Sequence, residues 1–234
     1  SVIDDSLGGF SGGFSDGSWA CFCPFKHFSG SYGGIRSSVT VDRNTLRVFY
    51  SSLILCINST IWDGTGSVDT AVMSLDVGDL DPALRGFSEA IRVGRYAYLA
   101  PLASYTHTYT SRVIRINLGP VDIATKLKTL LAEGKRARNM LNVLDLTQKD
   151  SELSGFSSLY SSGKYLFLVP YRNEHTPQTG QRGHGKLVRI NMNNFAISGI
   201  DVVNMPLTSR TQIPSFADID LRCFTGGFAC KLCV

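Results

Sequence analysis

The sequence predicts an all-β protein of repeated antiparallel units, a β-propeller-like array that forms a small or incomplete ring and carries one surface helix. Three ungapped copies of the pattern GF-x6-G-x-[aromatic]-x2-[apolar]-x-P begin at Gly9, Gly86 and Gly155. The 234 residues include 23 glycines and 10% aromatic residues but only 18% charged residues, a composition that suits strands joined by tight turns. A unit of three or four strands cannot bury both of its faces alone, so the units must pack against one another.

Each repeat contains three strand signals in the same order. The first is rich in aromatic residues and stops at the proline of the pattern, because proline cannot continue a ladder of backbone hydrogen bonds. The second signal resembles the run Val-Ile-Arg-Ile-Asn at residues 113–117. The third signal is short and ends in an aspartate. The first signals lie at residues 19–22, 96–99 and 165–169. The second signals lie at 113–117 and 187–191, with a looser copy at 38–42, and the third lie at 74–76, 143–145 and 199–201.

Two insertions lengthen the repeats. The first, residues 45–70, contains an apolar strand signal at 53–57. The second, residues 121–139, predicts the surface helix near 121–133, because Asp122 can cap its start and apolar residues recur on one face. These apolar residues are Ile123, Leu127, Leu130 and Leu131. We interpret the helix as a cover for a sheet edge and both insertions as places where a partner contact was added.

The repeats divide the chain, a single repeat domain of residues 1–234, into four units. We place three of them at approximately residues 5–76, 77–145 and 146–201, and a degenerate fourth unit at 202–234. Residues 2–4 look like a detached copy of the third strand, and residues 214–228 look like a degraded copy of the pattern. Offset ends of this kind are typical of a ring or solenoid in which strands from both termini complete one unit.

Three segments carry a resemblance to a known repeat. They are GGFSDGSWACFCPF at residues 12–25, GKYLFLVPY at 163–171 and GKLVRIN at 185–191. Together they resemble the tandem repeat GGFSDGxYxYFxPY…VxR(I/V)(D/N)…VLDL of proteins from algae and other protists. The resemblance implies a propeller-like fold and no assigned activity. The chain departs from the pattern in the second strand of its first repeat and in its eroded fourth copy.

Five of the six cysteines lie in two groups near the ends of the chain. Cys21 and Cys23 are two apart on a predicted strand and therefore face the same way, and Cys223, Cys230 and Cys233 follow near the C-terminus. The two groups are candidates for a disulfide that clasps the first and last units together, a bond worth several kcal/mol. A zinc site from Cys21, Cys23, Cys230 and Cys233 is an alternative with an atypical C-x-C half, and buried reduced thiols are a third reading.

The segment Asn58-Ser59-Thr60 matches the acceptor pattern for N-glycosylation, which makes Asn58 a glycosylation candidate. Together with the cysteines it favours an oxidising compartment, either outside the cell or in an organelle lumen. No apolar stretch approaches the ~18 residues that span a bilayer, so we expect no transmembrane segment. The first residues lack the basic and apolar regions of a leader, so we expect any targeting peptide to be absent or already removed.

The charge of the chain does not indicate a nucleic-acid partner. The net charge of +4 is modest, and we interpret the dense basic run at residues 126–138 as the solvated side of the predicted helix. The segment GQRGHGK at 180–186 has the spacing of a phosphate-binding loop, but Leu187 stands where Ser or Thr would bind magnesium. We interpret it as a turn and expect no cofactor.

No nucleophile elbow, zinc-protease motif or other catalytic motif stands out, so we assign no catalytic residue. We expect a non-enzymatic binding or structural module, an accessory subunit or interaction scaffold with protein partners in a larger assembly. The alternatives are a carbohydrate-binding, lectin-like propeller that uses the loops after each proline, and a propeller hydrolase or lyase that uses the loop histidines. The candidate ligand residues in these loops are Tyr105, His107, Tyr109, Tyr171 and His175.

Overall fold

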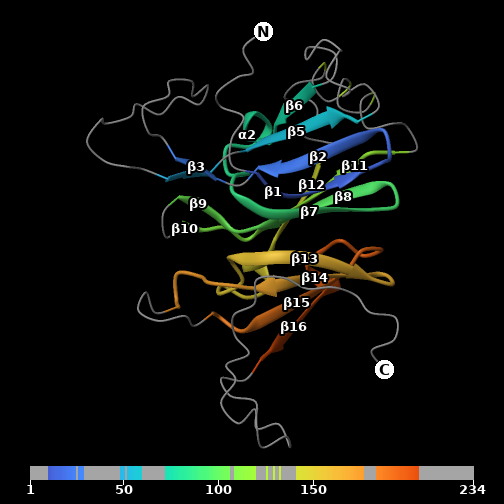
Figure 1. Ribbon diagram of the computed structural model, residues 1–234. Coiled ribbons are helices and arrows are strands. Elements are labelled where there is room, and N and C mark those ends of the chain that lie inside the picture. Colours follow the sequence, from blue (N-terminus) through green and yellow to red (C-terminus); the bar gives the residue numbers. More distant parts are fainter. Residues whose placement is uncertain are drawn as a thin grey trace, which may run out of the picture.

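The structure, a computed structural model, describes residues 10–24, 26–28, 48–50, 52–59, 72–105, 108–119, 141–176 and 183–205, together with residues 125, 129 and 132. Within these residues the protein is mostly β and contains three four-stranded antiparallel sheets. Figure 1 shows the sheets following one another in chain order, from the first at the top to the third at the bottom. In the described part of the chain they form an open array rather than a closed ring, which confirms the predicted all-β, propeller-like fold.

In each sheet, neighbouring strands pair in the order in which they occur along the chain. The first sheet consists of β1 (Phe10–Ser15), β2 (Trp19–Pro24), β5 (Leu53–Asn58) and β6 (Val72–Asp76). The second consists of β7 (Phe87–Val93), β8 (Tyr96–Pro101), β11 (Arg112–Asn117) and β12 (Leu141–Asp145). The third consists of β13 (Phe156–Ser162), β14 (Tyr165–Pro170), β15 (Lys186–Asn191) and β16 (Ile200–Asn204). In two further two-stranded sheets, β3 (Lys26–Phe28) pairs with β4 (Val48–Tyr50), and β9 (Ala103–Tyr105) pairs with β10 (Thr108–Tyr109).

The helical elements in the described residues are short turns beside the outermost strands. Apart from the helical residues 125, 129 and 132, they are α2 (Val77–Leu80), the 3-10 turn η2 (Leu146–Gln148) and the 3-10 turn η3 (Ile197–Gly199). The aspartates that end β6 and β12 cap the first two: Asp76 accepts the N–H of Gly78 at 2.8 Å, and Asp145 accepts that of Thr147 at 3.1 Å. The repeated acid of the sequence is therefore a capping residue at the exit of the sheet.

The predicted surface helix near residues 121–133 lies almost entirely outside the described residues. Only residues 125, 129 and 132 of it are described, and all three are helical. The hydroxyl of Thr129 donates to the carbonyl of Thr125 at 2.9 Å, the spacing of one helical turn. Among the described residues, every helix falls short of the length and apolar character that a membrane span requires.

The second strand of the first repeat is not where the sequence analysis placed it. We predicted it at residues 38–42, which lie outside the described residues, whereas the strand that pairs with β2 is β5. With β1 on its other edge, β2 has no edge left for another partner. The run LILCIN of β5 stands where the other repeats have RVIRIN and KLVRIN, and its uninterrupted apolar character hid that relationship.

The prediction that Asp201 ends the third strand of the third repeat is also wrong. Asp76 lies opposite the first residue of β5, and Asp145 lies opposite the first residue of β11. By the same register, the residue opposite Lys186 is Asn204, and the predicted Asp201 lies opposite Arg189. The third sheet thus extends to residue 204, and residues 206–234 of the predicted degenerate unit lie outside the described residues. The boundaries of the four units stay a prediction.

The first strands of the three sheets meet at equivalent positions of the repeat. β7 packs between β1 and β13, and each of the three strands has an irregularity in register just after its Gly-Phe pair. Gly12 and Ser158 occupy the position of Glu89 in their own repeats. A Cβ atom on Gly12 would lie 2.7 Å from the Glu89 side chain, so the absent side chain permits the close approach. The Glu89 carboxylate accepts hydrogen bonds from the Ser158 hydroxyl and, at 3.2 Å, from the N–H of Leu159. This position therefore links all three sheets.

Two apolar clusters fill the spaces between the sheets. The cluster between the first and second sheets includes Trp19, Ile54, Phe87, Leu99 and Ile114. The cluster between the second and third sheets includes Tyr98, Phe156, Leu166, Leu168 and Ile190. Because side chains alternate along a strand, neighbours such as Tyr98 and Leu99 face different clusters. The second sheet is thus covered on both faces, whereas the first and third sheets each have a face that belongs to neither cluster.

Candidate functional site

One row of side chains crosses each sheet at the same position of the repeat, on the face that points toward the next sheet. We call it the cross-strand row, because its four members lie opposite one another in strand register. The first row is Phe14, Cys21, Cys56 and Met73. The second row is Ile91, Tyr98, Arg115 and Asn142. The third row is Tyr160, Phe167, Arg189 and Asp201.

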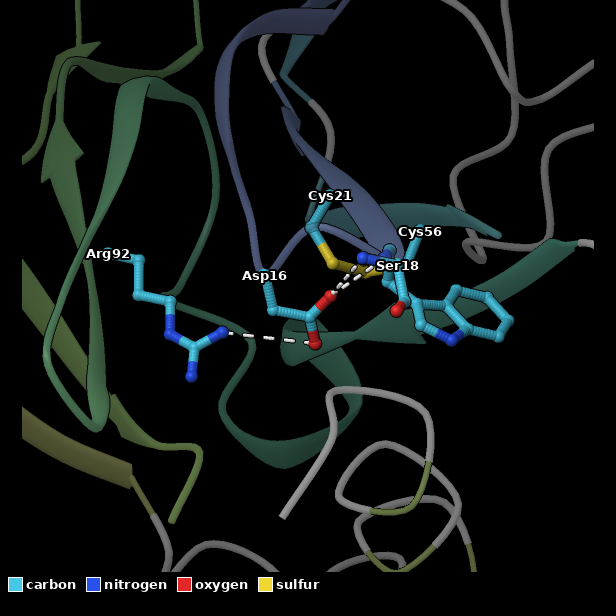
Figure 2. Close-up of a disulfide and its surroundings, with 6 residues drawn as sticks. Asp16, Ser18, Cys21, Cys56 and Arg92 are labelled. Carbon is cyan, nitrogen blue, oxygen red and sulfur yellow. Dashed lines mark hydrogen bonds and ion pairs between the residues drawn. A yellow bond between two sulfur atoms is a disulfide. The ribbon is translucent and has the colours of Figure 1, made fainter. Parts of the chain in front are cut away.

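The first row contains a disulfide between Cys21 and Cys56, shown in Figure 2. The two residues lie opposite each other on β2 and β5, with their Cα atoms 4.0 Å apart and 1% and 0% of their surfaces exposed. The terminal clasp predicted for Cys21 is therefore wrong, because its sulfur is joined to the neighbouring strand and is no longer a thiolate that could bind zinc. Aligning LILCIN with RVIRIN in the sequence would have placed Cys56 opposite Cys21.

Of the other cysteines in the two predicted groups, only Cys23 lies within the described residues. Cys23 is buried two residues beyond Cys21, and burial, with a smaller contribution from the charge of Glu89, raises the pKa of its thiol well above the ordinary value. Cys223, Cys230 and Cys233 lie outside the described residues. Within the described residues, no three His, Cys, Asp or Glu side chains are grouped so that they could hold a metal ion.

The hairpin that carries the first row is tied to the second sheet by Asp16. Its carboxylate accepts hydrogen bonds from the N–H groups of Ser18 at 2.9 Å and Trp19 at 2.7 Å. Its other oxygen lies 3.8 Å from the guanidinium of Arg92 on β7 (Figure 2). These contacts hold the turn between β1 and β2, and the pairing of β2 with β5 places Cys21 opposite Cys56.

In the second row, an arginine and a tyrosine stand where the first row has its disulfide. The Arg115 guanidinium lies between two rings, 4.7 Å from the centroid of Tyr96 in its own sheet and 4.5 Å from that of Phe195 next to the third sheet. It also donates to Asn142 at 2.8 Å and to the carbonyl of Met192 at 3.3 Å. Tyr98 beside it is only 1% exposed, and burial raises its pKa. The third sheet and its η3 loop therefore cover this row.

The third row again places an aromatic residue opposite an arginine, but no described sheet lies over it. Tyr160 and Phe167 stack with ring centroids 5.1 Å apart and an interplanar angle of 9°. Arg189 lies 4.4 Å from the ring centroid of Tyr165 and pairs with Asp201 at 2.7 Å, and these charged side chains are 42% and 57% exposed. Val203, two residues beyond Asp201 and on the same face, is 55% exposed. We call this surface the aromatic face; it consists of Tyr160, Tyr165, Phe167, Arg189, Asp201 and Val203.

Of the candidate ligand residues in the loops, the structure brings Tyr109 and Tyr171 together. Both interact electrostatically with Arg172, whose guanidinium lies 5.6 Å from the ring centroid of Tyr171, and burial raises the pKa of Tyr109. His175 is exposed, and its N–H donates to the side chain of Asn173 at 3.1 Å. His107 lies outside the described residues. Tyr105 ends β9, and no contact of its side chain is described.

His184, a histidine whose pKa is strongly shifted, was not among the predicted site residues. It lies in the glycine-rich segment before β15, edge-on to Phe156 with ring centroids 5.2 Å apart. Its Nε2 is 3.2 Å from the carbonyl of Gly155, and its Nδ1 accepts the N–H of Lys186 at 3.2 Å. These two partners select the neutral tautomer with its proton on Nε2. Burial lowers the pKa of His184 to about 4.

We expect the burial of His184 to make the protein less stable as the pH falls from about 6.5 to about 4. In this window the unfolded chain binds a proton on the imidazole and the folded protein does not, so stability rises with pH; above about 6.5 neither state is protonated and the dependence ends. The total effect is roughly 3 kcal/mol. Urea unfolding of wild type and His184→Gln across this range measures it, because the groups far from residue 184 titrate alike in both proteins; Asp150, whose pKa the charge of His184 helps to lower, is the exception. Parallel pH profiles for the two proteins would contradict this expectation.

Asn58, the glycosylation candidate, occupies a turn position of the repeat. It ends β5, as Asn117 ends β11 and Asn191 ends β15. The side-chain oxygens of Asn117 and Asn191 each accept the N–H of the residue two positions on, at 3.0 and 3.1 Å. An asparagine at this position can therefore serve to hold the turn after the strand, without any role in glycosylation. Glycosylation of Asn58 stays a prediction.

No protein-family model matches the sequence, and no curated protein matches it either. The resemblance to repeat proteins of algae and other protists stays an expectation, and the function must be argued from the geometry of the sheets.

Proposed function

We propose that the protein is a non-enzymatic binding and structural module, an accessory subunit or interaction scaffold, and that it contacts its protein partner through the aromatic face. The observation that supports this most is the difference between equivalent positions of the sheets. Leu75 and Leu144 are 3% and 5% exposed because another sheet packs on them, whereas Val203 at the equivalent position of the third sheet is 55% exposed. Aromatic rings and an arginine beside a polar rim are the composition that protein interfaces favour.

The Cys21–Cys56 disulfide supports the proposal that the protein is located in an oxidising compartment. Bonds of this kind form and persist in secreted proteins and in organelle lumens, and reducing compartments remove them. Cys21–Cys56 is buried within one sheet, where it holds β2 to β5. We therefore propose that the scaffold operates outside the cell or in a lumen.

A photo-crosslinking amino acid tests the contact surface. We expect a crosslinker in place of Val203 to capture a protein in extracts of the source cells, and a crosslinker in place of Val143 to capture none. Val143 is the matched control, because it is 40% exposed but lies on β12 of the second sheet. Equal capture at both positions, or no capture at either, would argue against the aromatic face as a contact surface.

The convergence of Tyr109, Tyr171 and Arg172 supports a second candidate, a carbohydrate-binding module. Tyrosine rings beside a guanidinium offer a flat surface and hydrogen-bond donors to a sugar. Calorimetric titration with the sugars selected by a glycan array tests this candidate. Heat of binding that disappears in Tyr171→Ala would support it, and the absence of binding at millimolar sugar would remove it.

A further inference from the structure

We infer that the aromatic face binds the aromatic face of a second copy of this chain, so that two copies form a dimer with two-fold symmetry. The inference rests on the proposed function and names the partner. It follows from comparing the third sheet, at the lower end of the array in Figure 1, with the two sheets whose equivalent surfaces are covered.

One pair of apolar residues marks the difference between the covered sheets and the third sheet. The pair lies on the third and fourth strands of each sheet, two residues from the cross-strand row and on the same face. The equivalent pairs are Ile54 with Leu75, Val113 with Leu144, and Leu187 with Val203. The first two pairs are at most 5% exposed, whereas Leu187 is half-buried and Val203 is 55% exposed. No described sheet covers this apolar surface on the third sheet, so a partner that buries it gains stability.

The surroundings of the two equivalent arginines show what else the partner must bring. Arg115 is held between a ring of its own sheet, Tyr96, and a ring supplied from beside the next sheet, Phe195. Arg189 has the equivalent ring of its own sheet, Tyr165, at 4.4 Å, and its side chain is 42% exposed. The fitting partner therefore brings a second aromatic ring to the guanidinium of Arg189.

The third row carries both halves of such a contact. Read across the sheet, it consists of Tyr160, Phe167, Arg189 and Asp201, two aromatic residues followed by two residues of opposite charge. The other rows lack this division, since the first has no charged residue and the second has one. Because the two charges of the third row cancel, two copies of the row can meet without net repulsion.

Two-fold symmetry pairs the aromatic half of one row with the charged half of the other. An axis parallel to the strands and midway between β14 and β15 lays β14 on β15 of the second copy, and β13 on its β16. Phe167 then supplies the second ring to Arg189 of the second copy, and the hydroxyl of Tyr160 can donate to Asp201 of that copy. Each contact forms twice, and Val203 of each copy is buried against β13 of the other.

Sedimentation velocity of the full 234-residue chain over a wide range of concentration tests the inference. We expect the wild type to pass from monomer to dimer and no further, because a two-fold contact occupies the aromatic face of both copies. Val203→Asp should raise the dissociation constant at least about tenfold, since an unpaired carboxylate would be buried in the contact. Val143→Asp, on β12 of the second sheet, is the control for an added charge and should dimerise as the wild type does. Circular dichroism and thermal unfolding establish that both variants are folded.

A photo-crosslinker in place of Val203 in the purified protein locates the contact. Copies with natural and with heavy nitrogen are mixed, so that the mass of a crosslinked peptide pair distinguishes a link between copies from a link within one copy. We expect links between copies that attach on β13 or β14, the strands that the two-fold axis places over β16 and β15. A link confined to one copy, an attachment outside the third sheet, or a wild type that stays monomeric or grows beyond a dimer overturns the inference.

These outcomes are distinguishable from a failure of the proposed function. If the wild type is monomeric while a crosslinker at position 203 captures a different protein in extracts, the proposed function stands and the second copy is ruled out. If position 203 captures nothing and the wild type is monomeric, both fail.

Discussion

We expect Gly155→Ala to destabilise the protein by about 4 kcal/mol or more, enough to leave much of the chain unfolded at physiological temperature. Gly155 has a φ of +71°, a conformation that costs a residue with a side chain roughly 1–2 kcal/mol. A Cβ atom would also collide with the backbone carbonyl of Arg172 and with the ring of Tyr109, and a carbonyl cannot rotate away as a flexible side chain can. The same residue donates its N–H to Thr110 and accepts that of Tyr171, so a backbone shift would break both bonds.

Gly163→Ala is the matched control for this prediction. Gly163 also has a positive φ, +56°, but nothing lies within 4 Å of the Cβ atom that alanine would add. We therefore expect a loss of only roughly 1–2 kcal/mol, the conformational cost alone. Urea unfolding of both variants gives the comparison. Equal losses at the two positions would show that the predicted collision at Gly155 is relieved by movement of the Arg172 loop.

Removal of the Cys21–Cys56 disulfide should have the second large effect. The bond links residues 35 positions apart, and the loop-closure estimate for that length is roughly 3–4 kcal/mol. For a chain of this size we expect the double variant Cys21→Ala/Cys56→Ala to unfold about 10 °C below the wild type. Differential scanning calorimetry measures the shift. A reducing agent should lower the unfolding temperature of the wild type and leave that of the double variant unchanged.

Cys23→Ala separates the cross-link from the packing of a sulfur atom. Cys23 lies on the same strand as Cys21 and is equally buried, at 1% exposure, so its truncation removes similar contacts without opening a bond. We expect a loss of roughly 1 kcal/mol from this change. If Cys23→Ala destabilises the protein as much as the double variant does, packing rather than the cross-link accounts for the effect. If a reducing agent does not change the unfolding temperature of the wild type, the bond is absent from the isolated protein.

The architecture could be predicted because its determinants are local. A strand signal between Gly-Phe and proline needs only the alternation of side chains and the inability of proline to continue a ladder. The signals at residues 96–99 and 165–169 lie within β8 and β14. The prediction for the second strand of the first repeat was wrong because β5 lies within the segment predicted as an insertion and is apolar in its first five residues, so that its correspondence to β11 and β15 is visible mainly in the terminal asparagine.

The candidate site could not be predicted in the same way, because strand register decides it. Nothing local in the sequence joins Cys21 to Cys56, but the pairing of β2 with β5 places them directly opposite. The same register places Tyr98 opposite Arg115 and Phe167 opposite Arg189. His184 was overlooked for a related reason: the fold of residues around it, not its neighbours in sequence, buries it against Phe156 and lowers its pKa.

The repeated all-β units could be predicted from the chain alone, since hydrophobic alternation and turn residues act over a few positions. What the equivalent residues of those units do depends on how the sheets pack. Leu99, Leu168 and Phe22 occupy one position of the repeat, yet the first two are fully buried and the third is 37% exposed. The physical reason is that burial depends on whether another sheet packs on that face, and such packing is a property of the whole array. The aromatic face of the third sheet, which carries the proposed contact, is therefore visible only in the assembled fold.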